Sequence, residues 1–286
     1  MIKLVINADD FGEFRCVSAG ILECVEAGSV SATGVMSNSP LFAELAKDLK
    51  AYPQLDCGVH LNLSRGVPLT ASMAASLQRW NGVFPGKAAA VAAVAAGRLS
   101  LETVEAEWRA QIERALEAGL TIRFLNAHEH VHLWPSLRRL VVGLAQEYGI
   151  PWVRKLLPDF SGPVSAAALC RNLAVGLLQR LPPGLPVGCR VDCLGLGASG
   201  SLDATALRKI FERLPANGVF ELMCHPGRLD RSEVNDPRLL AYHDWERERQ
   251  FLCSSDFVEL CASFSIELTR FSDMSFGALA PVQVSR

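Results

Sequence analysis

The histidines and the paired aspartates of this chain fall at a few informative places. Five of the six histidines, together with Asp9 and Asp10, lie at or just beyond the ends of short apolar segments of the kind that form strands. A carboxylate and two imidazoles can hold a catalytic metal ion and leave positions open for water and substrate. Such an ion polarises a carbonyl and lowers the pKa of its bound water from ~15.7 towards ~7. These residue types indicate a metal-dependent hydrolase in which a second aspartate is free to act as base.

A run of alternating histidines is the strongest of these signals. His128, His130 and His132 are two residues apart, so an extended segment would direct all three side chains to the same side. Three imidazoles on one face are hard to explain by packing alone. We therefore expect a metal or catalytic site at this run.

The other polar residues each have a purely structural alternative. Asp9 and Asp10 could form a turn or cap a helix, where aspartate is common. His60 could be a hydrogen-bonded histidine of the core, and His225 could simply precede a Pro-Gly turn. The functional interpretation is favoured because all of these residues follow predicted strands.

Short β-branched segments alternate with longer helical patterns along the whole chain, which predicts an α/β fold built from one domain over residues 1–286. The strand candidates are 3–7, 31–36, 56–62, 122–127, 152–155, 190–194, 220–224 and 266–270. The helical patterns are 17–28, 41–50, 101–119, 135–149, 166–181, 203–214, 238–250 and 255–263. Alternation of this length favours a parallel β/α barrel of the TIM type over an open doubly wound sheet, and the strand ends of a barrel open on one face.

Several helix ends carry their own signals. Gly28 is placed to end the first helix, Ser100 to cap the one at 101–119, and Pro135 to start the next. The Ala-rich stretch at 87–97 and the Gly/Pro-rich stretches at 158–165 and 182–188 resemble insertions or long loops.

Charge and composition exclude several classes of protein. The formal net charge is −2, which gives no electrostatic case for a nucleic-acid partner. The nine cysteines are scattered and odd in number, so we expect reduced thiols, and Cys189 and Cys193 lack a second pair for a structural zinc site. The start of the chain has no signal-peptide pattern, and no apolar run reaches the ~18 residues of a membrane span. We expect a cytoplasmic protein without a membrane span.

At the polar motifs the sequence resembles the YdjC-type carbohydrate deacetylases, which include chitooligosaccharide deacetylases and deacetylases of lipid-linked amino sugars. The resemblance runs nearly from end to end. Its motifs are NADDFG at 7–12, the segment 20–33, GVHLNL at 58–63 with GVPL at 66–69, AHEHVH at 127–132, GLGASG at 195–200 and ELMCHPG at 221–227.

The resemblance implies a distorted TIM-like barrel that hydrolyses the N-acetyl group of an amino sugar with a divalent metal ion, Mg²⁺ or Zn²⁺. By the family pattern the metal ligands are Asp10, His60 and His128, and the catalytic residues are Asp9 as base and His225 as acid. His130, His132 and Asn62 are assigned to the surroundings of the ligands or to contacts with the sugar. Adjacent carboxylates that face one metal can exchange the roles of ligand and base, so which of Asp9 and Asp10 has which role stays open.

One departure from the family pattern concerns the third motif. Many relatives carry Asp-Ser-His there, whereas this chain has Asn126, Ala127 and His128. The variant resembles relatives that act on hopanoid-linked or polyprenyl-linked sugars, and the apolar segment at 164–181 is a candidate contact for such a lipid at the membrane surface. A homodimer is compatible with the sequence. The rival functions are hydrolysis of another amide or of a phosphoester, and non-catalytic sugar binding.

Overall fold

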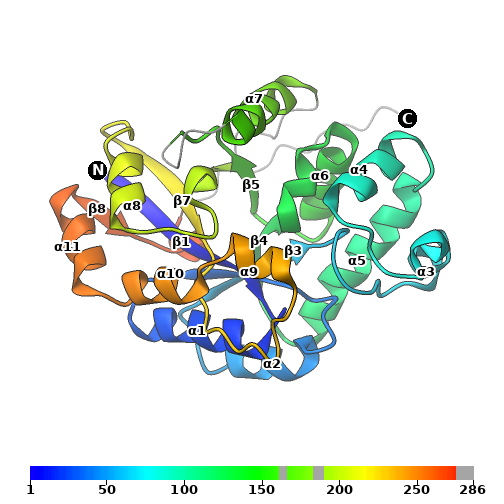
Figure 1. Ribbon diagram of the computed structural model, residues 1–286, viewed down its shortest axis with the longest axis horizontal. Coiled ribbons are helices and arrows are strands. Elements are labelled where there is room, and N and C mark those ends of the chain that lie inside the picture. Colours follow the sequence, from blue (N-terminus) through cyan, green and yellow to red (C-terminus); the bar gives the residue numbers. More distant parts are fainter. Residues whose placement is uncertain (161–165, 183–189, 275–286) are drawn as a thin grey trace.

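A ring of parallel strands forms the centre of the molecule in this computed structural model, which describes all residues except 161–165, 183–189 and 275–286 (Figure 1). The strands are β1 (Ile2–Phe11), β2 (Ala32–Val35), β3 (Asp56–Leu61), β4 (Ile122–Ala127), β5 (Trp152–Leu156), β6 (Arg190–Leu194), β7 (Gly218–Cys224) and β8 (Ile266–Leu268). The order β2-β3-β4-β5-β6-β7-β1 closes on itself because β1 also pairs with β2. The TIM-like α/β barrel in a single domain is confirmed, and an open sheet is excluded.

Two strands share one side of β1. β8 pairs in parallel with the first part of β1, from Ile2 to Leu4, while β2 pairs with its later part, from Asn7 onwards. The ring therefore has seven strands, with β8 attached at the beginning of β1. That the domain extends over the whole of 1–286 stays a prediction.

Helices surround the barrel (Figure 1). They are α1 (Arg15–Glu26), α2 (Phe42–Leu49), α3 (Ala71–Ser76), α4 (Lys87–Ala95), α5 (Leu101–Glu117), α6 (Pro135–Glu147), α7 (Ala166–Arg180), α8 (Ala204–Phe211), α9 (Pro237–Tyr242), α10 (Trp245–Leu252) and α11 (Ser255–Ser263). Short 3₁₀ turns are η1 (Gln78–Trp80), η2 (His128–Leu133), η3 (Leu196–Ala198) and η4 (Phe271–Asp273). Within the described parts of the chain, none of the helices has both the length and the apolar character that crossing a bilayer requires.

The predicted helix ends are confirmed. The Ser100 hydroxyl accepts a hydrogen bond from the Thr103 amide at 3.1 Å, Pro135 opens α6, and Gly28 follows α1 with a φ of 76°. Only glycine adopts that left-handed conformation without strain, which is why a helix commonly ends beside it.

Other expectations need correction. The Ala-rich stretch at 87–97, expected as an insertion or a long loop, is not a loop but forms α4, since alanine is the strongest helix former. The pattern at 238–250 is broken into α9 and α10 at His243 and Asp244. β1 extends to Phe11, so Asp9 and Asp10 lie inside a strand end and not after it. Of the two Gly/Pro-rich stretches expected as insertions or loops, positions 161–165 of the first (158–165) and positions 183–188 of the second (182–188) lie outside the described residues. Cys189 also lies outside them. The eight cysteines that are described are free thiols.

The barrel interior is layered. One end is filled by an apolar cluster of Val5, Ala32, Phe124, Val191 and Phe271, in which the two phenylalanine rings stack with centroids 4.6 Å apart. Because strand residues alternate between faces, the next inward positions after Val5 on β1 are 7 and 9. The apolar layer thus supports a polar layer nearer the carboxyl ends of the strands.

Candidate metal and catalytic site

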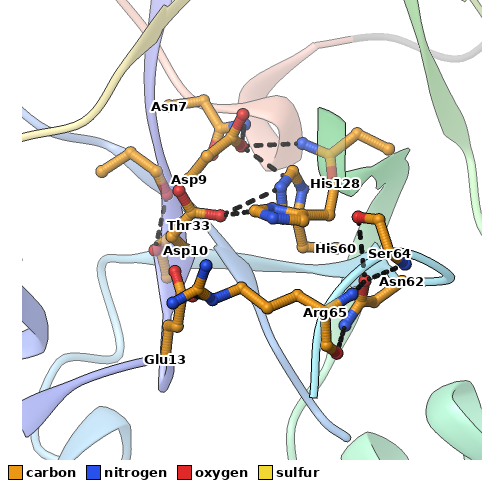
Figure 2. Close-up of polar contacts among 12 residues, drawn as sticks. Asn7, Asp9, Asp10, Glu13, Thr33, His60, Asn62, Ser64, Arg65 and His128 are labelled. Atoms are coloured by element: carbon orange, nitrogen blue, oxygen red, sulfur yellow. Dashed lines mark hydrogen bonds and ion pairs between the residues drawn. The ribbon is translucent and has the colours of Figure 1, made fainter. Parts of the chain in front are cut away.

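The carboxyl ends of four strands bring the predicted site residues together, and Figure 2 shows Asp9, Asp10, His60 and His128. Asp9 and Asp10 lie near the end of β1, and His60 lies near the end of β3. His128 follows β4, and His225 follows β7. All five line one cavity of about 650 Å³. The sequence-based expectation that these strand ends open on one face is met.

Three of these residues form a compact group of possible metal ligands. One atom from each of Asp10, His60 and His128 lies within 4.8 Å of the other two. The Asp10 Oδ1 atom is 2.9 Å from His128 Nδ1 and 3.3 Å from His60 Nε2, and all three residues are largely buried. One carboxylate and two imidazoles on the same side of a cavity fit a divalent ion that keeps open positions for water and substrate.

Asp10 and His128 form a buried ion pair within this group. Burial alone would lower the pKa of His128, but the Asp10 carboxylate raises it to about 9. Burial alone would raise the pKa of Asp10, but His128 and His60 hold it well below its usual value. Asp10 also has a φ of 69°, an uncommon conformation for a residue other than glycine that is often found at functional sites.

Asp9 belongs to a different set of contacts. Arg154 on β5 donates to both of its oxygens, at 2.5 Å to Oδ2 and 2.9 Å to Oδ1, and also donates from Nε to Glu221 at 2.9 Å. Asn7 donates to the same Glu221 oxygen at 2.7 Å. Burial alone would raise the pKa of Asp9, but Arg154 and His60 lower it, so its carboxylate stays ionised.

Asn126 links the two sets. Its Oδ1 lies 2.7 Å from His60 Nδ1, and its Nδ2 donates to Asp9 Oδ1 at 2.9 Å. With the amide in this orientation, Asn126 Oδ1 accepts from His60 Nδ1, and His60 Nε2 is the ring nitrogen directed at Asp10. Asn126 therefore fixes the orientation of one candidate ligand and one candidate base together.

Gly34 on β2 makes room for this arrangement. A Cβ atom at position 34 would lie 3.1 Å from Asp9 Oδ1, 3.3 Å from Asn126 Oδ1 and 3.3 Å from the His60 Cβ. Those contacts are tighter than ordinary van der Waals packing, so a side chain at 34 would displace the polar layer.

His225 lies on another wall of the cavity. Its backbone amide donates to the buried Glu248 carboxylate at 2.6 Å, and its ring centroid lies 5.1 Å from that of His243. Burial lowers the pKa of His225, while Asp10 and Asp9 act against this shift.

The histidine run does not have the geometry expected from alternation. β4 ends at Ala127, and residues 128–133 form η2 with Glu129 and His130 in left-handed conformations, at φ values of 50° and 60°. His130 lines the cavity beside His128, but His132 is turned into the protein, where its Nε2 lies 3.2 Å from the Arg154 carbonyl oxygen. The prediction of three side chains on one side of an extended segment is wrong, because a strand cannot continue through two left-handed residues.

Asn62 serves the loop after β3. Its side chain donates to Asn38 Oδ1 at 3.0 Å and to the Arg65 carbonyl oxygen at 2.6 Å, and it accepts from the Ser64 amide at 2.9 Å. These bonds turn Ser64 and Arg65 towards the cavity, which both of them line.

Sequence reasoning missed the interior charges and most of the cavity rim. Arg154 and Glu221 are fully buried within strands, and the only available signal was a charged residue inside an otherwise apolar segment. Lys87, Arg171 and Tyr242 also line the cavity, from helices distant in the sequence.

Comparisons with known proteins indicate the family of this chain. A family model described as YdjC-like protein matches residues 3–263. The chain is 32% identical to a carbohydrate deacetylase of Halalkalibacterium halodurans, over 80% of this chain and 86% of the relative. It is 28% identical to carbohydrate deacetylase 1 of Listeria innocua, over 96% of this chain and the whole relative. A solved structure described as a putative cellobiose-phosphate cleavage protein, from Enterococcus faecalis, matches with a TM-score of 0.73 and 25% identity over 94% of this chain and 97% of that one.

Proposed function

The chain belongs to the YdjC-like family, and from this membership we propose that it is a metal-dependent enzyme that hydrolyses the N-acetyl group of an amino sugar and releases acetate. Relatives across most of its length are named carbohydrate deacetylases. The observation that carries the proposal is the joint placement of Asp10, His60 and His128 at one cavity with Asp9 and His225. These are the parts that amide hydrolysis requires: a site for a metal ion, a base and an acid.

The donor set supports Asp10, His60 and His128 as the residues that hold the metal. Two imidazole nitrogens with one carboxylate suit zinc better than magnesium, which prefers oxygen ligands. A bound divalent ion would polarise the acetamide carbonyl and lower the pKa of water beside it. Asn126 would keep His60 in the tautomer that turns Nε2 to the ion.

Asp9 supports the reaction as the base. Its carboxylate accepts from Arg154 and Asn126, so it stays ionised, and it lies outside the group of three possible metal ligands. It would take a proton from the attacking water as the new C–O bond forms. His225 would give a proton to the leaving nitrogen as the C–N bond breaks, so that acetate and a free amine leave.

The surroundings of the cavity support a lipid-linked amino sugar. Helix α7 contributes Arg171 to the cavity, and three of its leucines, Leu169, Leu173 and Leu177, are exposed by 51%, 62% and 64%. They lie four residues apart, so they form one apolar stripe along an exposed helix face. We propose that this stripe contacts the lipid of the substrate at a membrane surface. A homodimer and a cytoplasmic location stay predictions from the sequence.

The test is acetate release from N-acetylglucosamine and N-acetylgalactosamine oligosaccharides and from their polyprenyl-linked analogues. The protein is first treated with a chelator and then supplied with zinc or magnesium. We expect release only after metal is restored. If no substrate yields acetate while one ion per chain is bound, the proposal fails, and phosphoesters and other amides become the substrates to test.

A further inference from the structure

Glu248 on α10 is a buried carboxylate without a positively charged partner among the described residues. Its side chain is fully buried, and its two oxygens accept from backbone amides: Oε2 from His225 at 2.6 Å and Oε1 from Leu202 at 3.1 Å. Burying an unpaired carboxylate costs several kcal/mol, which backbone hydrogen bonds offset only in part. Among the described residues the carboxylate is held by backbone amides, so the segments that carry those amides indicate what it does at this position.

The two amides belong to loops that follow neighbouring strands. His225 directly follows β7, and Leu202 lies between η3 and α8 in the connection after β6. The start of α10 makes two more bonds to the same loops. The Asp244 amide donates to the Gly200 carbonyl oxygen at 2.7 Å, and the Gly227 amide donates to the Trp245 carbonyl oxygen at 3.1 Å. One turn of α10 therefore holds both loops.

The ring of His225 is held differently from its backbone. His225 Nδ1 is buried and has no hydrogen-bond partner within the described parts of the chain, and the ring packs near that of His243, which stacks on Trp245 with centroids 4.7 Å apart. Packing restricts the ring, but no side-chain hydrogen bond from the residues that the structure describes fixes where it points. The position of the ring thus depends on its backbone, and the Glu248 carboxylate holds that backbone.

We propose that Glu248 is a positioning residue for His225, which it holds at the distance and angle needed to protonate the leaving nitrogen. This inference rests on the proposed function, in which His225 is the acid. Only a carboxylate offers acceptors to both amides, because a glutamine at 248 would turn its NH₂ group towards one of them. That amide would be left buried and unpaired, and the two loops that the carboxylate joins would lose one of their links, so the backbone of His225 would be held less firmly.

The test compares two reactions that differ in their need for an acid. Hydrolysis of an N-acetyl amino sugar needs a proton on the leaving nitrogen, whereas hydrolysis of p-nitrophenyl acetate releases a phenolate that needs none. The reference variant is His225→Ala, which should lose amide hydrolysis by about 10²–10⁴-fold, the usual contribution of an acid, and should keep ester hydrolysis. We expect Glu248→Gln to show the same selectivity, with amide kcat reduced by about 10–10²-fold and ester kcat within about threefold of the wild type.

The matched control is Glu107→Gln. Glu107 on α5 is also fully buried and also binds backbone amides, those of Leu69 and Thr70, but these belong to a loop far along the chain from His225. The Glu107→Gln variant should lower the melting temperature, as Glu248→Gln does, but it should leave the ratio of amide to ester hydrolysis unchanged. Zinc bound per chain, measured by calorimetry, counts the folded sites in every variant, and Glu248→Asp is the second variant if Glu248→Gln does not fold.

The outcomes are distinct. Selective loss of amide hydrolysis in the Glu248 variants establishes the positioning role. An unchanged ratio in those variants, with selective loss in His225→Ala, overturns it and leaves the proposed function intact. An unchanged ratio in His225→Ala removes the acid assignment itself, and the inference about Glu248 falls with it.

Discussion

Arg154 offers the most direct test of the charged layer inside the barrel. Its guanidinium is fully buried and donates to Asp9 and Glu221. Arg154→Met keeps a long side chain and removes the charge, so both carboxylates lose this cation. Removing one partner of a buried ion pair costs about 3–5 kcal/mol. At about 2–3 °C per kcal/mol for a protein of this size, we expect the melting temperature to fall by about 6–15 °C.

The loss should also depend on pH, with a sign set by Asp9. In the wild type the pKa of Asp9 is below its usual 3.8, so its contribution to stability is complete above that value and is lost only as the pH falls through the lower folded value. Without Arg154 burial dominates and raises the folded pKa of Asp9. Stability is then lost as the pH rises through that raised value. The variant should therefore lie further below the wild type at pH 8 than at pH 5.

Urea unfolding at both pH values measures this difference, with a chelator present so that metal binding does not add to stability. The matched control is Lys155→Met, the next residue of β5, whose ion pair with Asp192 at 2.8 Å is partly exposed. Such a pair contributes about 0–1 kcal/mol. If Arg154→Met costs no more than Lys155→Met, or costs the same at both pH values, the reasoning about the buried layer is wrong.

Three further predictions concern metal, base and thiols. Zinc binding to the metal-free protein at pH 7–8 should release about one proton per ion, because the pKa of His128 beside Asp10 is raised to about 9 and its imidazole must be neutral to bind. Calorimetry in buffers of different ionisation enthalpy measures this release. If no proton is released, the ion pair between His128 and Asp10 is contradicted. Asp9→Asn should keep the zinc stoichiometry and lower kcat by at least about 10²-fold; loss of zinc would mean that the two aspartates have the reverse roles. Mild peroxide should join Cys24 and Cys253, whose sulfurs are 3.6 Å apart, and peptide mapping that finds both thiols free would refute this.

The positions of the site residues could be predicted because they depend on local rules. Apolar segments mark the strands, and a residue at the end of a parallel strand reaches the same face whatever the details of packing. For this reason Asp10, His60, His128 and His225 were found from the sequence, although β1 extends further than its apolar pattern indicates.

The remainder depends on contacts between distant segments. Arg154 and Glu221 are charged residues within strands, and only the closed barrel, which brings β5, β7 and β1 together, makes them partners. The left-handed Glu129 and His130 carry no composition signal, since neither residue type favours that conformation as glycine does. Glu248 looks like an ordinary helical glutamate in the sequence and becomes informative only when its distance to the His225 amide is known.

Asn126 combines local sequence information with a contact between distant segments. Its departure from the family motif is visible in the sequence, whereas the consequence of that departure is visible only in the structure. The amide accepts from His60 and donates to Asp9 at 2.9 Å. An ionised aspartate at 126 would place two negative charges about 3 Å apart, a repulsion of roughly 6 kcal/mol at an effective dielectric constant of ~20. Such a pair would share a proton and compete for Arg154. With asparagine the guanidinium serves Asp9 and Glu221 alone, so Asp9 keeps the ionised form that a base needs.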